Sequence, residues 1–427
     1  MFFKNPMEVF NLYLKYLDIF LTTAWAWLPF VLAVVFFHSW MYYARRLHWR
    51  QLDWALLEIK PPKDVETTPK NMEHIFAGLW GSSGTVGNKK EKYLDGKLQD
   101  YFSLEIAGVN GEIHFYIRTL RKFRDLVEAQ VYSQFPQAEI KEVADYTLSM
   151  PMDIPNKNWD LWGCRLILAR DSVYPIRTFQ HFMDLAKDQV FFDPLAGLME
   201  VLGKLRQGEQ AWIQIFIRPI ADTWQEKARK LADKLLGKII KEKEGVLKTE
   251  IRTWREAISN VVEEFIIGKP ATDVKKQEAT GPASLMMFLS PGERDVIEGI
   301  EDKASKKGYE AKMQWAYFGR RDIFTMANVS AVMGLFNQYA NLNMNSLKPD
   351  PVTMTKANYI LAKLRKTYKQ RVLMRLLRQR SFWERGYIFN IEELATLYHF
   401  PTKMVQAPMT PYIPVKKGGA PVGLPTE

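Results

Sequence analysis

Residues 81–90 (GSSGTVGNKK) contain the glycines, hydroxyls and lysines that a phosphate-binding loop uses. A P-loop places two glycines five positions apart, followed directly by Lys and then Ser or Thr, so that backbone amides cradle the phosphate and the hydroxyl binds magnesium. Here the residue five positions after Gly81 is Val86, and no hydroxyl follows Lys90. The spacing argues against a nucleotide site, and we interpret the segment as a Gly/Ser connection between elements.

The other residues capable of catalysis or metal binding form no recognised motif. The six histidines lack metal-ligand spacing such as HxxxH, and the sequence contains neither GxSxG nor HExxH. The single cysteine, Cys164, lies in an apolar run and is interpreted as a buried thiol. Glu392 and Glu393 are interpreted as a solvated helix turn. We therefore predict a protein that is not an enzyme and binds no metal or cofactor, with an unfamiliar active site as the alternative.

A strongly basic segment begins at residue 356. Residues 356–380 contain nine Lys or Arg and no acidic residue, in a chain whose formal net charge is +11. Apolar residues recur between the cations at helical spacing, which predicts a helix that packs one face and presents the other. The alternative is a solvated helix docked on the protein itself or on an acidic partner. The candidate contacts for DNA phosphates or anionic lipid are Lys363, Arg365, Lys366, Lys369, Arg371, Arg375, Arg378 and Arg380.

Residues 24–43 form an apolar segment typical of a membrane-spanning helix. At 1.5 Å per residue, these twenty residues reach about 30 Å, which is the thickness of the hydrocarbon core of a bilayer. Aromatic residues lie at both ends, as in the interfacial belts of membrane proteins. The predicted anchor residues are Trp25, Trp27, Leu28, Phe30, Val31, Leu32, Val34, Val35, Phe36, Phe37, Trp40, Tyr42 and Tyr43.

The flanks of this segment indicate its orientation. Arg45, Arg46 and Arg50 follow it, whereas the lysines that precede it are accompanied by acidic residues. Because basic residues gather on the cytoplasmic side, we predict a single-pass protein of the cell (inner) membrane with the bulk of the chain in the cytoplasm. A cleaved signal peptide is the alternative, but the apolar run is long, begins late and lacks a small-residue cleavage site.

The region after the anchor alternates between strand and helix patterns. Asn110 and Gly111 supply the turn signal of a β-hairpin. The order of the elements around this turn is typical of part of a ferredoxin-like α/β sandwich. The predicted strands are residues 56–60, 101–106, 113–118 and 139–143, and the predicted helices are residues 71–80 and 120–135.

A second unit of the same kind is predicted later in the chain. Its strand candidates, residues 211–217 and 313–318, are separated by a charged helical insertion at about 238–307. We therefore expect an α+β fold in which ferredoxin-like sandwich units follow a transmembrane helix. The predicted divisions are residues 1–50 (amphipathic segment and anchor), 51–150 (first unit), 151–345 (second unit with its insertion) and 346–427 (basic helix and extended tail).

Four phrases occur in a fixed order along the chain, and together they resemble a known family. They are WALLEI at 54–59, FSLEI at 102–106, GE at 208–209 before a strand that ends IRP at 217–219, and EELATLYHFP at 392–401. As an ordered set they resemble the region that precedes the motor domain in type IV secretion and conjugation ATPases of the HerA-type superfamily. In such proteins a segment like residues 420–425 leads into the ATPase core, and no ATPase motif is found in this sequence.

The resemblance implies the membrane-proximal accessory part of a translocation machine. We therefore expect a non-catalytic, membrane-anchored scaffold of a type IV secretion or conjugation-like system that docks a motor ATPase at the cytoplasmic membrane face. The expected partners are the membrane and a motor ATPase, with DNA and further copies of this chain as additional candidates. The alternative function is a membrane-bound DNA-binding protein that uses residues 356–380.

Overall fold

The computed structural model describes residues 20–62, 68–184, 190–236 and 289–401, apart from positions 83, 85–87 and 383, together with a few positions before residue 20. Most of the predicted amphipathic segment, most of the predicted helical insertion and residues 402–427 of the predicted tail lie outside the described residues.

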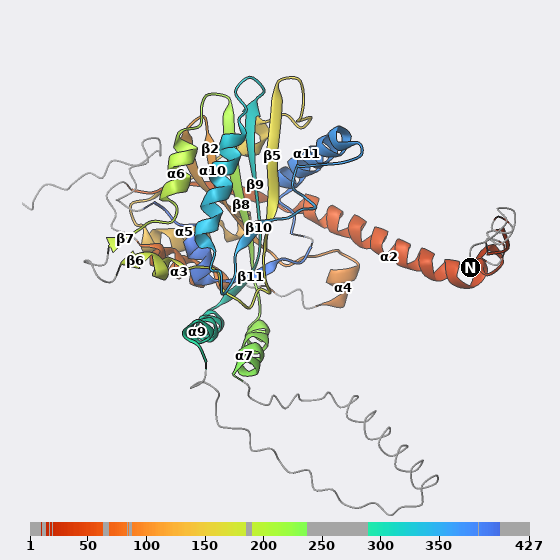
Figure 1. Cartoon of the computed structure of the whole chain (residues 1–427), viewed down its shortest axis with the longest axis horizontal. Helices are drawn as coiled ribbons and strands as arrows, with labels where there is room; N and C mark the ends of the chain where they lie inside the picture. The colour runs from red at the N-terminus through yellow and green to blue at the C-terminus, as the bar shows by residue number, and fades with distance from the viewer. Residues whose placement is uncertain are drawn as a thin grey trace, which may run out of the picture.

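Strands and helices alternate along most of the described chain (Figure 1). The strands are β1 (Trp54–Lys60), β2 (Phe102–Val109), β3 (Glu112–Leu120), β4 (Glu139–Glu142), β5 (Trp159–Leu168), β6 (Met183–Asp184), β7 (Val190–Phe191), β8 (Glu209–Pro219), β9 (Gly308–Arg320), β10 (Leu347–Pro349) and β11 (Tyr387–Asn390). The α-helices are α2 (Ala24–Gln51), α3 (Pro69–Trp80), α4 (Lys89–Tyr93), α5 (Arg124–Gln134), α6 (Ala196–Gly203), α7 (Thr223–Leu235), α9 (Pro291–Ser305), α10 (Met326–Phe336), α11 (Ala362–Gln379) and α12 (Ile391–Leu397).

The first half of the chain forms a ferredoxin-like unit. Its elements follow the order β1-α3-β2-β3-α5-β4, and its strands lie side by side as β4-β1-β3-β2 with every pair antiparallel. The turn between β2 and β3 places Asn110 and Gly111 at φ 54° and 92°. Two-residue hairpin turns favour positive φ at such positions, which Asn and Gly tolerate best. The predicted strands, helices and hairpin of this unit are confirmed.

The second half repeats this order with an insertion. Its elements β5-α6-β8-β9-α10-β10 give the antiparallel strand order β10-β5-β9-β8, and α7 and α9 lie between β8 and β9. β2 and β8 also pair antiparallel, from Phe102–Ile217 to Val109–Gln210. The two units therefore share one nine-stranded sheet, to which β11 adds beside β9. The predicted α+β class is confirmed.

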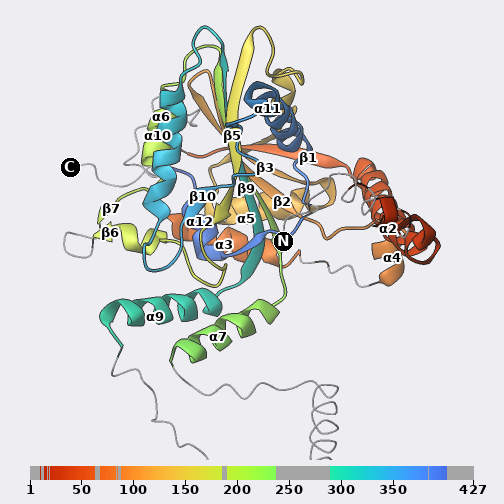
Figure 2. The same ribbon diagram turned by 45° about the vertical axis from the view of Figure 1, so that its right-hand side comes forward.

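Helices cover both faces of this sheet (Figures 1 and 2). One face packs against α3, α5, α6, α10 and α12, and this layer holds the main core. On the other face, Leu373, Met374 and Leu377 of α11 pack in a second core that includes Trp212. Because helices cover both faces of the sheet, β2 and β8 are buried along nearly their whole length.

Residues 387–401 differ from the predicted extended tail because they bury large apolar side chains. α12 begins with a capping box between Asn390 and Glu393, and Tyr398 and Phe400 lie in the main core. The predicted solvated turn at Glu392 and Glu393 is also wrong, since both side chains are buried. Glu393 pairs with the equally buried Lys303 at 2.9 Å between Oε2 and Nζ. Burial of these carboxylates is possible because each has a cationic partner.

α2 projects as one long helix from the sheet and the helices that cover it, here named the body (Figure 1). It is the one helix in the described part of the chain that is long and apolar enough to cross a membrane. Only 6 % of its apolar window is buried, whereas the core helix of a soluble protein would be mostly buried. Its 28 residues extend about 42 Å, so a bilayer core of about 30 Å leaves its C-terminal end free to contact the body.

Candidate interaction surface

The C-terminal part of α2 is packed against the body. Met41 and Ala44 are buried, and Nε1 of Trp40 donates a hydrogen bond to the carbonyl oxygen of Tyr93 at 2.9 Å. Gly96 has φ +66°, and a Cβ at this position would lie 2.3 Å from the carbonyl carbon of Ala44. Only glycine allows this backbone approach. The helix is therefore fixed to the loop that carries α4.

The thirteen predicted anchor residues all lie on α2. Their side chains are exposed, apart from partly buried Trp27 and Trp40. Phe37 also contacts Tyr93, with 6.1 Å between ring centroids. Phe37 lies six residues before the C-terminal end of the predicted span, so this contact places α4 beside the last part of that span.

Exposed cations gather along the body end of α2. Of the three residues predicted to set the topology, Arg46 and Arg50 are exposed and Arg45 is partly buried. α4 contributes lysines beside the residues that contact α2. This arrangement suits the anionic headgroups of a phospholipid surface. The group, here named the basic collar, consists of Arg46, Arg50, Lys89, Lys90 and Lys92.

The predicted basic helix is α11, and its cations differ in exposure. Lys369 is partly buried and donates to the carbonyl oxygen of Pro351 at 3.0 Å. Arg378 is also partly buried and donates to the carbonyl oxygen of Met150. The exposed candidates that can meet an external anion are Lys363, Arg365, Lys366, Arg371 and Arg375.

A buried network of ion pairs holds the C-terminal end of α11 on the sheet. The guanidinium of Arg380 lies 2.7 Å from Oε1 of Glu105 and 2.7 Å from Oδ2 of Asp145. Burial would raise the pKa of Asp145, but hydrogen bonds from Arg380 and Thr147 outweigh it and hold that pKa at about 2. The prediction that Arg380 contacts an anionic partner is wrong, because its side chain is fully buried and paired with two carboxylates.

This network belongs to a row of polar side chains beneath α11 that the sequence analysis missed. Nε2 of Gln314 donates to Oε1 of Gln214 at 2.8 Å and lies 3.2 Å from the carbonyl oxygen of Leu376. The row therefore joins the sheet to the helix. Its members occupy aligned positions on six neighbouring strands and are Glu58, Tyr116, Glu105, Gln214, Gln314 and Arg165.

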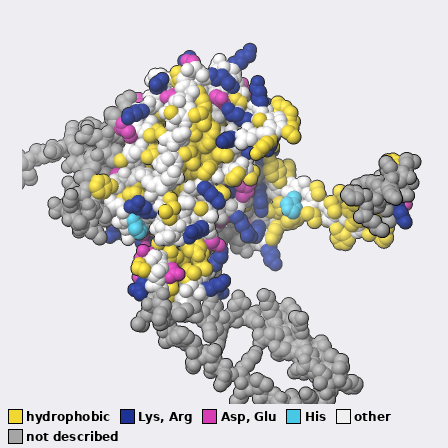
Figure 3. Space-filling view, in the orientation of Figure 1, with side chains coloured by type: hydrophobic (Ala, Val, Ile, Leu, Met, Phe, Trp, Pro, Cys, Tyr) yellow, Lys and Arg dark blue, Asp and Glu magenta, His cyan; other side chains and the backbone are white. Residues whose placement is uncertain are grey.

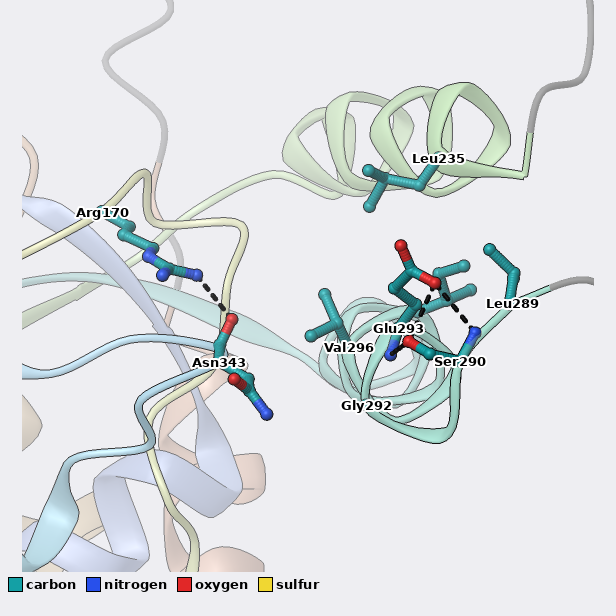
Figure 4. Close-up of a pocket in the computed structure, with 9 residues that line it drawn as sticks. Arg170, Leu235, Leu289, Ser290, Gly292, Glu293, Val296 and Asn343 are labelled. Carbon is teal, nitrogen blue, oxygen red and sulfur yellow. Dashed lines mark hydrogen bonds between the residues drawn. The ribbon is translucent and has the colours of Figure 1, made fainter.

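A cavity of about 480 Å³ lies beside α7 and α9 (Figure 4). Arg170 donates to the carbonyl oxygen of Asn343 at 2.5 Å, and Ser290 and Glu293 form the capping box of α9. The apolar part of the lining is Leu235, Leu289, Val296 and Ile297. Oγ of Ser290 donates to Oε2 of Glu293 at 2.9 Å, but both groups are held in the cap of α9, so we assign no chemistry to the cavity.

Two further titratable groups are also held inside the fold. Burial raises the pKa of the Cys164 thiol to about 12, and the predicted buried thiol is confirmed. Nε2 of His399 lies 2.9 Å from Oδ1 of Asp193, while Nδ1 lies 2.9 Å from the carbonyl oxygen of Ala395. A histidine bonded through both nitrogens holds α12 in place. No group of three or more His, Cys, Asp or Glu side chains in the described residues is placed to hold a metal ion.

A family model described as "Domain of unknown function (DUF8128)" matches residues 43–410, a range that includes the whole nine-stranded sheet, α11 and α12. Among curated proteins no match is found.

Proposed function

We propose that this chain, which belongs to the DUF8128 family, is a membrane-anchored scaffold that docks a motor ATPase at the cytoplasmic face of the cell (inner) membrane. The observation that carries the proposal is the fixed junction of α2 with the body, where Trp40 bonds to Tyr93 and Gly96 packs against Ala44. A freely jointed anchor would only tether the body. A packed junction also orients the body on the bilayer, as a docking scaffold requires.

The placement of the polar residues supports a role without catalysis. Glu105, Glu393 and His399 are buried and bonded to partners inside the fold, so they stabilise the body and are not free to act on a substrate. Active sites, by contrast, concentrate perturbed titratable groups in accessible clefts.

The basic collar supports the cytoplasmic orientation. Its five exposed cations lie on the body side of the candidate span, and basic residues near a span favour the cytoplasmic side. The body would then face the compartment that contains ATP and any ATP-driven motor.

The choice of a motor of the type IV secretion or conjugation kind rests on the resemblance. The phrases that carry it lie in β1, β2, β8 and α12, which all belong to the body. In the resembled proteins the equivalent region precedes the ATPase domain. We infer that the body of this chain offers the same kind of support to a separate motor.

The test is to purify the tagged full chain in detergent from native membranes, measure ATP hydrolysis and identify co-purifying proteins. We expect no hydrolysis by the chain after a high-salt wash, and recovery of a P-loop ATPase before it. In cells that express a variant lacking residues 20–44, the same ATPase should leave the membrane fraction. ATP turnover by the washed chain would overturn the proposal. So would an ATPase that stays in the membrane fraction of cells that express the deletion variant.

A second candidate function is DNA binding by α11. The observation in its favour is the group of five exposed cations on this helix. Such binding would weaken steeply with salt, because neutralised phosphates release counterions. The variants described below also test this candidate.

A further inference from the structure

The segment that leads into α11 exposes a run of large apolar side chains. Tyr359 is 90 % exposed and Tyr368 is 70 % exposed, with Ile360, Leu361 and Leu364 exposed between them. Single exposed apolar residues are common on soluble proteins, but a contiguous group marks an interaction surface.

The backbone holds this run in a strained conformation. Tyr359 and Leu361 have φ 69° and 55°, in the left-handed region that non-glycine residues rarely adopt. Each such residue costs of the order of 1 kcal/mol. The fold therefore sustains an unfavourable turn that displays Tyr359, Ile360 and Leu361 to the outside.

α11 itself has two apolar faces. Leu373, Met374 and Leu377 pack on the sheet. At 100° per residue, Leu361 and Tyr368 lie roughly on the opposite side of the helix. A helix that is apolar on two faces requires a second apolar partner besides its own core.

Exposed cations lie at the same end of α11 as the exposed apolar side chains. Lys356, Lys363, Arg365 and Lys366 are exposed, and residues 356–380 contain no acidic side chain. Arg365 and Lys369 also border an apolar cavity of about 400 Å³ beside Tyr368. Large apolar residues interleaved with cations are typical of helices that lie in the interface of anionic membranes. DNA phosphates would use the cations and leave the apolar face uncovered.

The position of α11 selects the bilayer as the partner. α11 and α2 leave the same side of the sheet in both ribbon views (Figures 1 and 2), and hydrophobic atoms cover the tip of α11 on that side (Figure 3). The hydroxyl of Tyr101 donates to the carbonyl oxygen of Arg380 at 2.5 Å, and its ring contacts Trp54 just after α2. The bases of the two helices are therefore adjacent.

We infer that the N-terminal end of α11 is a second membrane contact that binds anionic phospholipid headgroups beside the anchor. The contact surface, here named the α11 patch, consists of Tyr359, Ile360, Leu361, Leu364 and Tyr368 with Lys356, Lys363, Arg365 and Lys366. The inference rests on the proposal that α2 crosses the bilayer. The packed junction fixes the body relative to α2, and a second contact would also fix the tilt of α2 and the body together relative to the bilayer.

The test compares the full chain in nanodiscs of phosphatidylcholine with nanodiscs that also contain phosphatidylglycerol. Hydrogen exchange of residues 356–364 should slow about tenfold in the anionic discs, because cations near an anionic surface bind it additively. The variant Lys363→Glu/Lys366→Glu/Leu364→Asp should lose this protection, while Arg371→Glu/Arg375→Glu on the same helix should retain it. Both variants should stay close to the Tm of the parent chain, since all five side chains are exposed and the ion pair that is lost, between Lys366 and Asp160 at 3.8 Å, lies at the surface.

Three results would overturn the inference. The first is equal exchange of residues 356–364 in both kinds of disc. The second is salt-sensitive binding of a DNA duplex that is lost in both variants, which would assign α11 to nucleic acid. The third is two chains per disc with protection that disappears on dilution, which would assign the patch to a second copy. Failure of α2 to span would be separately visible as rapid exchange of residues 24–43.

Discussion

Arg380 and Glu105 form an ion pair, 2.7 Å between Nε and Oε1, in which both side chains are completely buried. Arg380 ends α11, and Glu105 lies on β2, the strand that joins the first unit to β8 of the second. Gln214, opposite Glu105 on β8, donates to the same carboxylate at 3.3 Å. The pair therefore fastens α11 over the junction of the two units and sets the direction in which the helix leaves the sheet.

Replacing Arg380 by Met should destabilise the chain by about 3–5 kcal/mol, because Glu105 and Asp145 would remain buried without a cation. Urea unfolding of the detergent-solubilised chain, followed by far-UV circular dichroism, measures this change. Arg371→Met is the matched control on the exposed face and should change stability by less than about 0.5 kcal/mol. Equal effects of the two substitutions would contradict the assignment of Arg380 as a structural residue.

Asp145 should make stability dependent on pH in the acid range. Its pKa in the folded state is about 2, below the ordinary value of 3.8, so the charged carboxylate stabilises the fold above about pH 4. This contribution, of about 1–2 kcal/mol after allowance for partial solvent exposure, is lost as the pH falls from 4 towards 2. Asp145→Asn should therefore be less stable than the parent at pH 6, and the gap should narrow by pH 2.5. A gap that is constant across this range would refute the role.

Gly96→Ala should loosen the junction between α2 and the body. The added Cβ would lie 2.3 Å from the backbone of Ala44, and the residue would keep an unfavourable φ of +66°. We expect a loss of at least about 1 kcal/mol and faster hydrogen exchange in residues 89–97. Gly334→Ala in α10, where a Cβ meets nothing within 4 Å, should be neutral or stabilising by up to about 1 kcal/mol. Unchanged exchange in Gly96→Ala would contradict the packed junction.

The order of elements within each unit could be predicted because it depends on short-range patterns. The Asn110-Gly111 turn and the alternation of residues 113–118 identify a hairpin without knowledge of the rest of the chain. The pairing of β2 with β8 could not be predicted in this way. Both strands are buried on both faces, so their sequences carry little signal for register or neighbour.

The division of the α11 cations into exposed and buried residues also depends on distant elements. Arg375 and Arg380 occupy similar basic contexts in the sequence. In the structure Arg380 is buried because it pairs with Glu105 and Asp145, which are distant in the chain, whereas Arg375 is exposed. One signal was available. Glu105 interrupts the apolar run FSLEI, and a carboxylate in a central strand covered on both faces needs a cationic partner. The sequence indicates that such a partner exists without indicating which residue it is.

Cys164 should be unreactive in the folded chain. With a pKa of about 12, its thiolate fraction at pH 8 is about one in ten thousand, and the side chain is buried. A maleimide reagent should label the native chain only slightly in one hour and label it completely in urea. Rapid labelling of the native chain would show that β5 opens readily.

Because Cys164 does not react in the folded chain, labelling of an introduced cysteine reports only the position of that cysteine relative to the membrane. The central claim is that α2 crosses the membrane and holds the body in the cytoplasm. The direct measurement is labelling of Asn5→Cys, Ser133→Cys and Ser305→Cys by a membrane-impermeant maleimide in spheroplasts, before and after lysis. We predict that Asn5→Cys is labelled before lysis, and that Ser133→Cys and Ser305→Cys, both at exposed positions of the body, are labelled only afterwards. Labelling of either body cysteine in intact spheroplasts, or loss of the N-terminal segment by cleavage, would contradict the account.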